Sequence, residues 1–312
     1  MNALEQIKTN IKKVMIGQEK VIDLLLISIA AGGHVLLEDL PGTGKTVLAR
    51  SMAKSMNLTY SRIQFTPDLL PSDVTGLNYF NQKENGFVFR QGPVFSNLLL
   101  ADEINRATPR TQSALLECMG EGQVTTDGET RILPAPFFVI ATQNPVETLG
   151  CYPLPEAQLD RFLMKISMES LNTADEKALI DRFIEDEPLK TLTPVADIPG
   201  ILALQENCRR VFVHDDLRTY IASLIMASRS GTSVTIREGV SPRGTLALLR
   251  ASQGCALLNG RDYVVPEDIR EVAVPVLAHR LICEERYYEA KQDRIRRLIS
   301  GTPVPTEDWS RP

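Results

Sequence analysis

The pattern of hydrophobic and polar positions changes about three fifths of the way along the chain. Up to about residue 185, short apolar runs alternate with stretches of helical period, as in a parallel sheet covered by helices. Five runs are candidate strands, at residues 34–38, 60–65, 97–102, 136–142 and 163–168. The third and fourth contain Leu-Leu-Leu-Ala and Phe-Phe-Val-Ile-Ala, which do not alternate, so we expect both strands to be buried at the centre of the sheet.

A proline-marked stretch at residues 188–200 separates this part from a second one that is helical in period. Residues that typically begin helices occur there at Asp215-Asp216, Ser241-Pro242 and Pro266-Glu267-Asp268. The last segment, residues 282–300, mixes charges of both signs and resembles a solvated helix. The pattern predicts an α/β domain over residues 1–187, a linker over 188–200 and a helical domain over 201–312.

Composition and charge narrow the class of protein. The 312 residues are 43% hydrophobic and 23% charged, which is typical of a globular protein and excludes a mainly disordered one. The net charge of −5 argues against nucleic acid as an obligatory partner. Residues 21–31 form the longest apolar candidate for a membrane span, but they are too few and contain Asp23, so we expect a buried helix. The N-terminus lacks the features of a secretion signal, which predicts a cytoplasmic location.

Cysteine and histidine offer no metal site. The five cysteines are odd in number and widely spaced, with no Cys-x-x-Cys pair, so we expect reduced thiols and neither disulfides nor zinc. The three histidines are scattered along the chain, and His214-Asp215 has no second cluster to complete a metal pair. The only metal ion that we expect is Mg²⁺ bound together with a nucleotide.

A glycine-rich loop follows the first candidate strand. Residues 38–46 read Glu-Asp-Leu-Pro-Gly-Thr-Gly-Lys-Thr, and a helix is predicted from Lys45 onward. Glycines let backbone N–H groups converge on phosphates, Lys45 can reach the outer phosphates, and the Thr46 hydroxyl can bind Mg²⁺. Asp39 replaces the first glycine of the usual motif, which affects the turn but not the phosphate contacts. The loop predicts that a nucleoside triphosphate binds here.

Polar residues at the ends of two later strands point to hydrolysis. Asp102 is placed to hold Mg²⁺ through water, and Glu103 to polarise the attacking water as a general base. Asn144, after the fourth candidate strand, could orient this water and sense the γ-phosphate. A GTPase would need an Asn-Lys-x-Asp element, which the sequence lacks, and a metabolite kinase has less use for Glu103. Hydrolysis of ATP to ADP and phosphate is therefore the predicted reaction.

Six segments together resemble the MoxR family of AAA+ ATPases, and the resemblance covers nearly the whole chain. They are Ile16-Gly17-Gln18-Glu19, the loop at 38–46, Ala-Asp-Glu-Ile-Asn-Arg-Ala at 101–107, Ala-Thr-Gln-Asn-Pro at 141–145, Leu-Pro-Glu-Ala-Gln-Leu-Asp-Arg-Phe at 154–162 and Ser241-Pro242-Arg243. Asp39 also resembles the MoxR form of the loop. The resemblance implies a P-loop AAA+ core with a five-stranded parallel sheet flanked by helices, followed by an all-helical lid domain. It also implies ATP bound between core and lid, and between subunits of a ring that is usually a hexamer.

The resemblance also assigns roles to single residues. Ile16 and Gly17 would lie by the adenine, Asn144 would be sensor 1, and Arg243 would be sensor 2. Arg161 would enter the neighbouring subunit's site, although Arg106 and Arg110 compete for this role. The expected ATP-binding residues are Ile16, Gly17, Pro41, Gly42, Thr43, Gly44, Lys45, Thr46, Val47 and Arg243. The expected catalytic residues are Glu103, Lys45, Asn144, Arg161 and Arg243, and the expected Mg²⁺ ligands are Thr46 and Asp102.

The resemblance implies chaperone-like remodelling of protein clients, in part with partners that carry von Willebrand factor A domains. Two segments, 66–91 and the hairpin-like 122–132, could contact a client or could be plain connecting loops. Three alternatives remain open: a DNA-associated motor, the ATPase subunit of a metal chelatase, and a nucleotide-gated scaffold that barely turns over. The low pI and the single basic side chain at 123–131 disfavour the motor.

Overall fold

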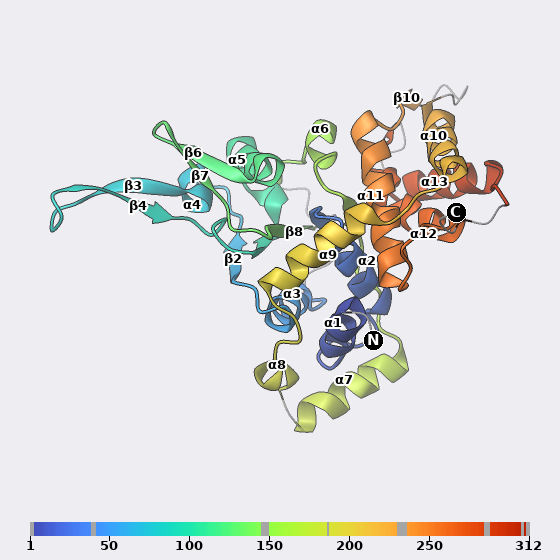
Figure 1. The fold of residues 1–312 in the computed structure, drawn as a ribbon. Coiled ribbons are helices and arrows are strands. Elements are labelled where there is room, and N and C mark those ends of the chain that lie inside the picture. The colour runs from blue at the N-terminus through green and yellow to red at the C-terminus, as the bar shows by residue number, and fades with distance from the viewer. Residues whose placement is uncertain are drawn as a thin grey trace.

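The central feature of the computed structural model is a five-stranded parallel sheet (Figure 1). The structure describes residues 3–38, 42–144, 150–185, 187–229, 236–283, 288–306 and 309. The strand order is β2-β5-β8-β1-β9, and every neighbouring pair is parallel. The strands are β1 (Val35–Glu38), β2 (Tyr60–Gln64), β5 (Leu98–Asp102), β8 (Phe138–Gln143) and β9 (Met164–Ile166). All five predicted strands are confirmed, and the two continuous apolar runs, β5 and β8, are buried inside the sheet.

Alternating side chains of the strands supply two hydrophobic clusters, one on each face of the sheet. Val35 and Leu37 of β1 belong to the first cluster and Leu36 to the second, because successive side chains of a strand point to opposite faces. The first cluster includes α1 (Ala3–Lys12), α2 (Glu19–Ala30) and α3 (Lys45–Ser55), and the second includes α5 (Pro109–Glu121). The predicted apolar helix at 21–31 is α2, which is buried along most of its length.

Two antiparallel hairpins interrupt the α/β pattern. The first, β3 (Gly76–Asn81) with β4 (Gly86–Gln91), follows the short helix α4 (Pro71–Thr75) and extends away from the sheet (Figure 1). The second, β6 (Gln123–Thr126) with β7 (Glu129–Ile132), turns at Asp127-Gly128 as the sequence predicts. Asn78 Nδ2 donates to Asp127 Oδ2 at 2.7 Å, so the hairpins contact each other. The sequence analysis identified the first segment but not its strands.

The C-terminal part is mainly helical and shares the first hydrophobic cluster with the sheet. Its long helices are α9 (Ile198–Arg210), α10 (Asp215–Arg229), α11 (Pro242–Leu258), α12 (Pro266–Leu277) and α13 (Tyr288–Gly301). The helices α10, α11 and α12 begin at the residues that the sequence predicts. A Cβ on Gly254 of α11 would lie only 3.0 Å from the Ile27 carbonyl oxygen, so α11 packs closely on α2.

Shorter elements complete the chain and differ in detail from the sequence prediction. The segment 188–200 holds α8 (Pro188–Thr191) and the first residues of α9, and residues 282–283, where the sequence predicts a helix, form a strand instead. The helical part also contains a small strand pair, β10 (Ile236–Glu238) with β11 (Ile282–Cys283). The remaining elements are η1 (Ile104–Arg106), α6 (Glu156–Leu159), α7 (Thr173–Glu185) and η2 (Ala278–Arg280).

Over the described ranges, none of the helices combines the length and apolar character that a membrane crossing requires. Cys118, Cys151, Cys208 and Cys255 are free thiols. Within the same ranges, no group of three or more His, Cys, Asp or Glu side chains is arranged to hold a metal ion.

Two histidines are buried at structural positions. His34 is 8% exposed, accepts a hydrogen bond from the Val139 backbone N–H at Nδ1 (3.1 Å), and lies 3.1 Å from the Met119 carbonyl oxygen through Nε2. This pattern requires a neutral ring that carries its proton on Nε2. Burial lowers the pKa of His34 to about 4, and burial together with the adjacent Arg280 lowers the pKa of His279 well below its usual value.

We expect the protein to lose stability on mild acidification because of these histidines. The unfolded chain takes up protons near pH 6.5 while His34 in the folded chain stays neutral down to about pH 4. The His34 contribution is therefore complete above pH 6.5 and lost as the pH falls, at a cost of up to about 3 kcal/mol in the free energy of unfolding. The free energy of unfolding, measured by urea titration at several pH values, tests this expectation. A His34→Gln variant should show a shallower acid slope, and an unchanged slope would contradict the assignment.

Candidate functional site

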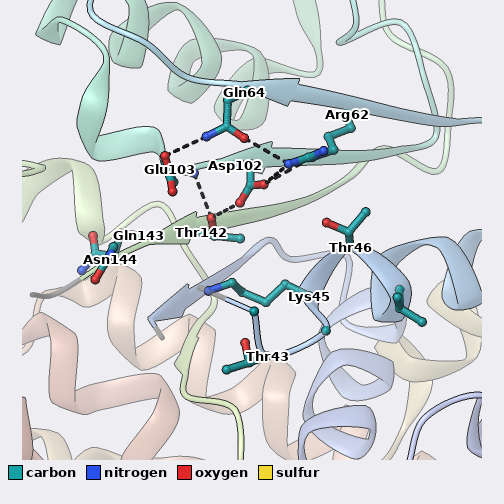
Figure 2. A pocket seen from close by; sticks show the side chains of 13 residues that line it. Thr43, Lys45, Thr46, Arg62, Gln64, Asp102, Glu103, Thr142, Gln143 and Asn144 are labelled. Carbon is teal, nitrogen blue, oxygen red and sulfur yellow. Dashed lines mark hydrogen bonds and ion pairs between the residues drawn. The ribbon is translucent and has the colours of Figure 1, made fainter. Parts of the chain in front are cut away.

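The carboxyl ends of the parallel strands surround a cavity of about 400 Å³ (Figure 2). Strand register brings Gln64 opposite Asp102, and Glu38 opposite Gln143. The cavity is lined by Gly42, Thr43, Gly44, Lys45, Thr46, Val47, Arg62, Gln64, Asp102, Glu103, Thr142, Gln143 and Asn144. The described part of the glycine-rich loop, both acids and Asn144 thus lie around one space, as expected for side chains that follow neighbouring parallel strands.

The glycine-rich loop has the backbone that a phosphate cradle needs. Gly42 and Gly44 have φ of 88° and 90°, which favours glycine, and Gly44 is the N-cap of α3. A Cβ added at Gly42 would meet no other atom within 4 Å, so open space adjoins the loop. The start of α3 faces this space with its N–H groups and positive dipole. The described residues therefore fit a polyphosphate; Asp39 and Pro41 lie outside the described residues.

Thr142 on β8 fixes the two acids at the end of β5. Its hydroxyl donates to Asp102 Oδ1 at 2.6 Å and accepts from the Glu103 backbone N–H at 2.8 Å. The other oxygen of Asp102, Oδ2, accepts from Arg62 Nη2 at 2.7 Å (Figure 2). The guanidinium thus supplies positive charge to the carboxylate that was expected to hold Mg²⁺. Asp102 and the Thr46 hydroxyl line the same cavity and are oxygen donors of the kind that Mg²⁺ prefers.

Glu103 has an unusual backbone and a firmly held side chain. Its φ of 56° and ψ of 49° are left-handed, which is uncommon for a residue other than glycine and often occurs at functional sites. Its Oε2 accepts from Gln64 Nε2 at 2.7 Å and from Arg106 Nε at 2.9 Å. Both partners must loosen before this oxygen can take a proton from water. Of the two arginines that compete with Arg161 for the trans role, Arg106 thus binds an acid of its own subunit, whereas Arg110 is exposed.

The sequence analysis did not identify Arg62, Gln64 or Thr142 as residues of the site. Arg62 and Gln64 alternate with buried Ile63 along β2, and Gln64 is the last residue of that strand. The rule that carboxyl ends of parallel strands meet at one edge could have identified Gln64, and with it the side chain that holds Glu103.

Ile16 and Gly17 do not line the cavity, but the residue that precedes them lies next to the loop. The methyl carbon of the preceding Met15 would be 3.6 Å from a Cβ on Gly44. Gln18 anchors the segment through two hydrogen bonds with the backbone of Glu169, at 2.7 and 3.0 Å.

Arg161 and Arg243 also lie outside the lining of the cavity. Arg161 Nη1 donates to the Leu116 carbonyl oxygen on α5 at 2.7 Å. Arg243 is more than half exposed, with Nη1 4.0 Å from Asp160 Oδ2. Asp160 also accepts from Ser241 Oγ at 3.0 Å and from buried Arg280 at 2.8 Å. The segment that carries Arg161 is thus tied to the helical part of its own chain.

Comparisons with known proteins agree with this arrangement. A family model described as "ATPase family associated with various cellular activities (AAA)" matches residues 34–164, and one described as "AAA lid domain" matches 228–299. Protein YeaC of Bacillus subtilis is 47% identical over 96% of this chain and 93% of its own length. Chaperone MoxR1 of Mycobacterium tuberculosis is 41% identical over 95% of this chain and 79% of its own length.

A crystal structure of a candidate ATPase from Cytophaga hutchinsonii has the same fold. Its TM-score is 0.89 at 40% identity, and the match covers 97% of this chain and 95% of that one. The predicted fold class is confirmed, with an AAA domain followed by a helical lid. Sequence identity to MoxR proteins over nearly the full length of this chain narrows the assignment from the AAA ATPases to one family. The chain therefore belongs to the MoxR family of AAA+ ATPases.

Proposed function

We propose that this chain hydrolyses ATP to ADP and phosphate with Mg²⁺, in the cytoplasm, as a subunit of a hexameric ring that remodels or matures protein partners. The domain bounds that we propose are a core at 1–187, a linker at 188–200 and a lid at 201–312. One observation carries the catalytic part of the proposal: a single cavity is lined by the phosphate loop, by Asp102 and Glu103, and by Asn144.

Different residues of the cavity would bind the phosphates, bind Mg²⁺ and activate water. Backbone N–H groups at 42–46 and Lys45 would hold the phosphates, and Thr46 and Asp102 would hold Mg²⁺, Asp102 through water. The ion would neutralise charge on the phosphates. Arg62 would release Asp102 when Mg²⁺ binds, because the guanidinium and the hydrated ion compete for the same carboxylate. Glu103, released by Gln64 and Arg106, would take a proton from the attacking water while Asn144 orients that water.

Two arginines outside the cavity would complete the site. Arg243 needs only a change of side-chain rotamer to leave Asp160, since the two groups are 4.0 Å apart and Arg243 is largely exposed. Arg161 would act on the nucleotide of the neighbouring subunit. A guanidinium near the γ-phosphate stabilises charge in the transition state, so hydrolysis would require assembly.

Phosphate release measured over a range of protein concentrations tests the ring. The specific activity should rise with concentration, in parallel with the assembled fraction seen by analytical ultracentrifugation, because each site takes Arg161 from a neighbour. An activity per subunit that stays constant while the protein dissociates would contradict the shared site. Absence of hydrolysis in the fully assembled protein, with ATP bound, would favour the nucleotide-gated scaffold.

The hairpins support a protein client rather than DNA. Phe87 of β4 is 76% exposed and Ile132 of β7 is 81% exposed, and exposed apolar side chains of this size are suited to contacts with protein. We expect an unfolded model protein to raise the rate of hydrolysis, and a Phe87→Ser/Ile132→Ser variant to lose this stimulation at unchanged basal activity. Stimulation by double-stranded DNA instead of protein would contradict the client proposal. Partners with von Willebrand factor A domains can be tested in the same assay.

A further inference from the structure

A buried lysine links the edge of the nucleotide site to the last helix of the lid. We propose that Lys165 and Tyr288 are positioning residues that couple the placement of α13 to the phosphate loop and to Asn144, by way of Glu38 and Gln143. The coupling in catalysis rests on the proposed ATP hydrolysis, but the contacts themselves join three adjacent strands and one lid helix.

Glu38 lies at the centre of this connection. It is the last residue of β1, and the glycine-rich loop follows directly. Its Oε1 accepts from Gln143 Nε2 at 2.7 Å, and its Oε2 lies 2.8 Å from Lys165 Nζ. Gln143 lines the cavity and directly precedes Asn144. The Glu38 carboxylate therefore fixes the end of β8 and the entry to the loop at the same time.

Lys165 brings a charge into the protein interior. It lies on β9 between buried Met164 and Ile166 and is itself only 7% exposed. Burial lowers the pKa of Lys165, and the Glu38 carboxylate opposes that shift. A hydrophobic side chain could fill such a position with similar or better stability, because burying an ammonium group costs solvation energy. The charge is thus better explained by the two contacts that it joins than by packing.

Tyr288 supplies the contact from the lid. It is the first residue of α13, and its ring lies over Lys165 Nζ at 4.0 Å from the ring centre. Its hydroxyl donates to the Lys165 carbonyl oxygen at 3.1 Å. One ammonium group is therefore held between the aromatic face of a lid residue and the carboxylate beside the phosphate loop.

The geometry explains how the lid could influence the site. A shift of α13 moves the Tyr288 ring relative to the Lys165 ammonium, which changes how strongly this group is shared with Glu38. Because Glu38 also binds Gln143, the change reaches the residue next to Asn144 through hydrogen bonds. Conversely, a nucleotide bound at the phosphate loop should restrain α13, since coupling between two sites is reciprocal.

Hydrogen exchange of the full-length protein tests this coupling without any need for hydrolysis. In the wild type, a non-hydrolysable ATP analogue should slow exchange both in α3 and in α13, by about fivefold or more in α13. Lys165→Met and Tyr288→Leu should abolish the slowing in α13 and keep it in α3. Lys165→Arg and Tyr288→Phe, which keep the charge and the ring, should retain it. Lys20→Met, at an exposed position of α2, is the matched control.

Steady-state kinetics provides the second readout. Lys165→Met and Tyr288→Leu should lower kcat by about fivefold or more and leave KM within about threefold, because the phosphate contacts remain. A purely structural role predicts instead that exchange in α13 rises equally with and without nucleotide; that outcome, or unchanged coupling and kcat, would overturn the proposal. If Lys165→Met does not fold, the comparison of Tyr288→Leu with Tyr288→Phe decides. A wild type that binds ATP without hydrolysing it would refute the proposed function but not the coupling seen by exchange.

Discussion

Replacement of Glu103 by Gln is expected to lower ATP hydrolysis by ~10²–10⁴-fold while ATP binding persists. Gln has nearly the same size and can still accept a hydrogen bond, but it cannot take a proton from water. The phosphate loop and Asp102 are untouched by the change, so ATP should still raise the melting temperature of the variant. Phosphate release under single-turnover conditions, with a thermal shift measured in parallel, checks both parts.

The matched control is Glu117→Gln, which removes the same charge from an exposed position of α5 outside the lining of the cavity. This variant should hydrolyse ATP at the wild-type rate. Hydrolysis within threefold of wild type in Glu103→Gln would show that another group activates the water, or that the cavity serves a different reaction.

Replacement of Arg161 by Ala is expected to lower hydrolysis by ~10³-fold or more in an assembled ring. The loss should appear in kcat, because a guanidinium at the γ-phosphate acts mainly in the transition state. Arg110→Ala removes the exposed arginine that competes for this role and should have a much smaller effect; an equal loss would assign the role to Arg110 instead. Loss of the hydrogen bond to the Leu116 carbonyl oxygen could also disturb α5, so the melting temperature of each variant is measured as well.

Mixing two inactive variants separates a trans role of Arg161 from a cis role. A Glu103→Gln subunit still offers Arg161 to its neighbour, and an Arg161→Ala subunit still has an intact Glu103. Mixed rings should therefore recover part of the activity that each variant lacks alone. No recovery in rings shown to contain both subunits would place the function of Arg161 in its own subunit.

The fold was largely predictable because its strongest signals are local. The strands β1, β5 and β8 are short apolar runs between helical stretches, and Ser241-Pro242 and Pro266 mark the starts of α11 and α12. The hairpin β3–β4 was missed because exposed aromatic residues, such as Phe87, interrupt the alternation that normally indicates a strand. The pair β10–β11 was missed because its strands are very short and far apart in sequence.

The site was predictable where a motif lies in consecutive residues, and not where contacts join distant strands. The loop and the acids stand out along the chain, whereas Gln64 acquires its role only from the register that brings it to Asp102 and Glu103. The partners of Lys165 could not be inferred either, since Glu38 and Tyr288 are far from it in sequence. The roles of Arg161 and Arg243 stay predictions, because the cavity of one chain does not include them.

The left-handed backbone of Glu103 determines which substitutions at this position can be interpreted. A β-branched residue such as Val or Thr would add backbone strain of ~1–2 kcal/mol to the loss of the carboxylate. Gly would relieve that strain and loosen the end of β5. In a library that varies residue 103, the activity of each variant would therefore depend on two unrelated effects, the loss of the proton acceptor and the backbone strain. Gln removes the proton acceptor and leaves the backbone strain nearly constant, so the comparison of Glu with Gln is the one that can be interpreted.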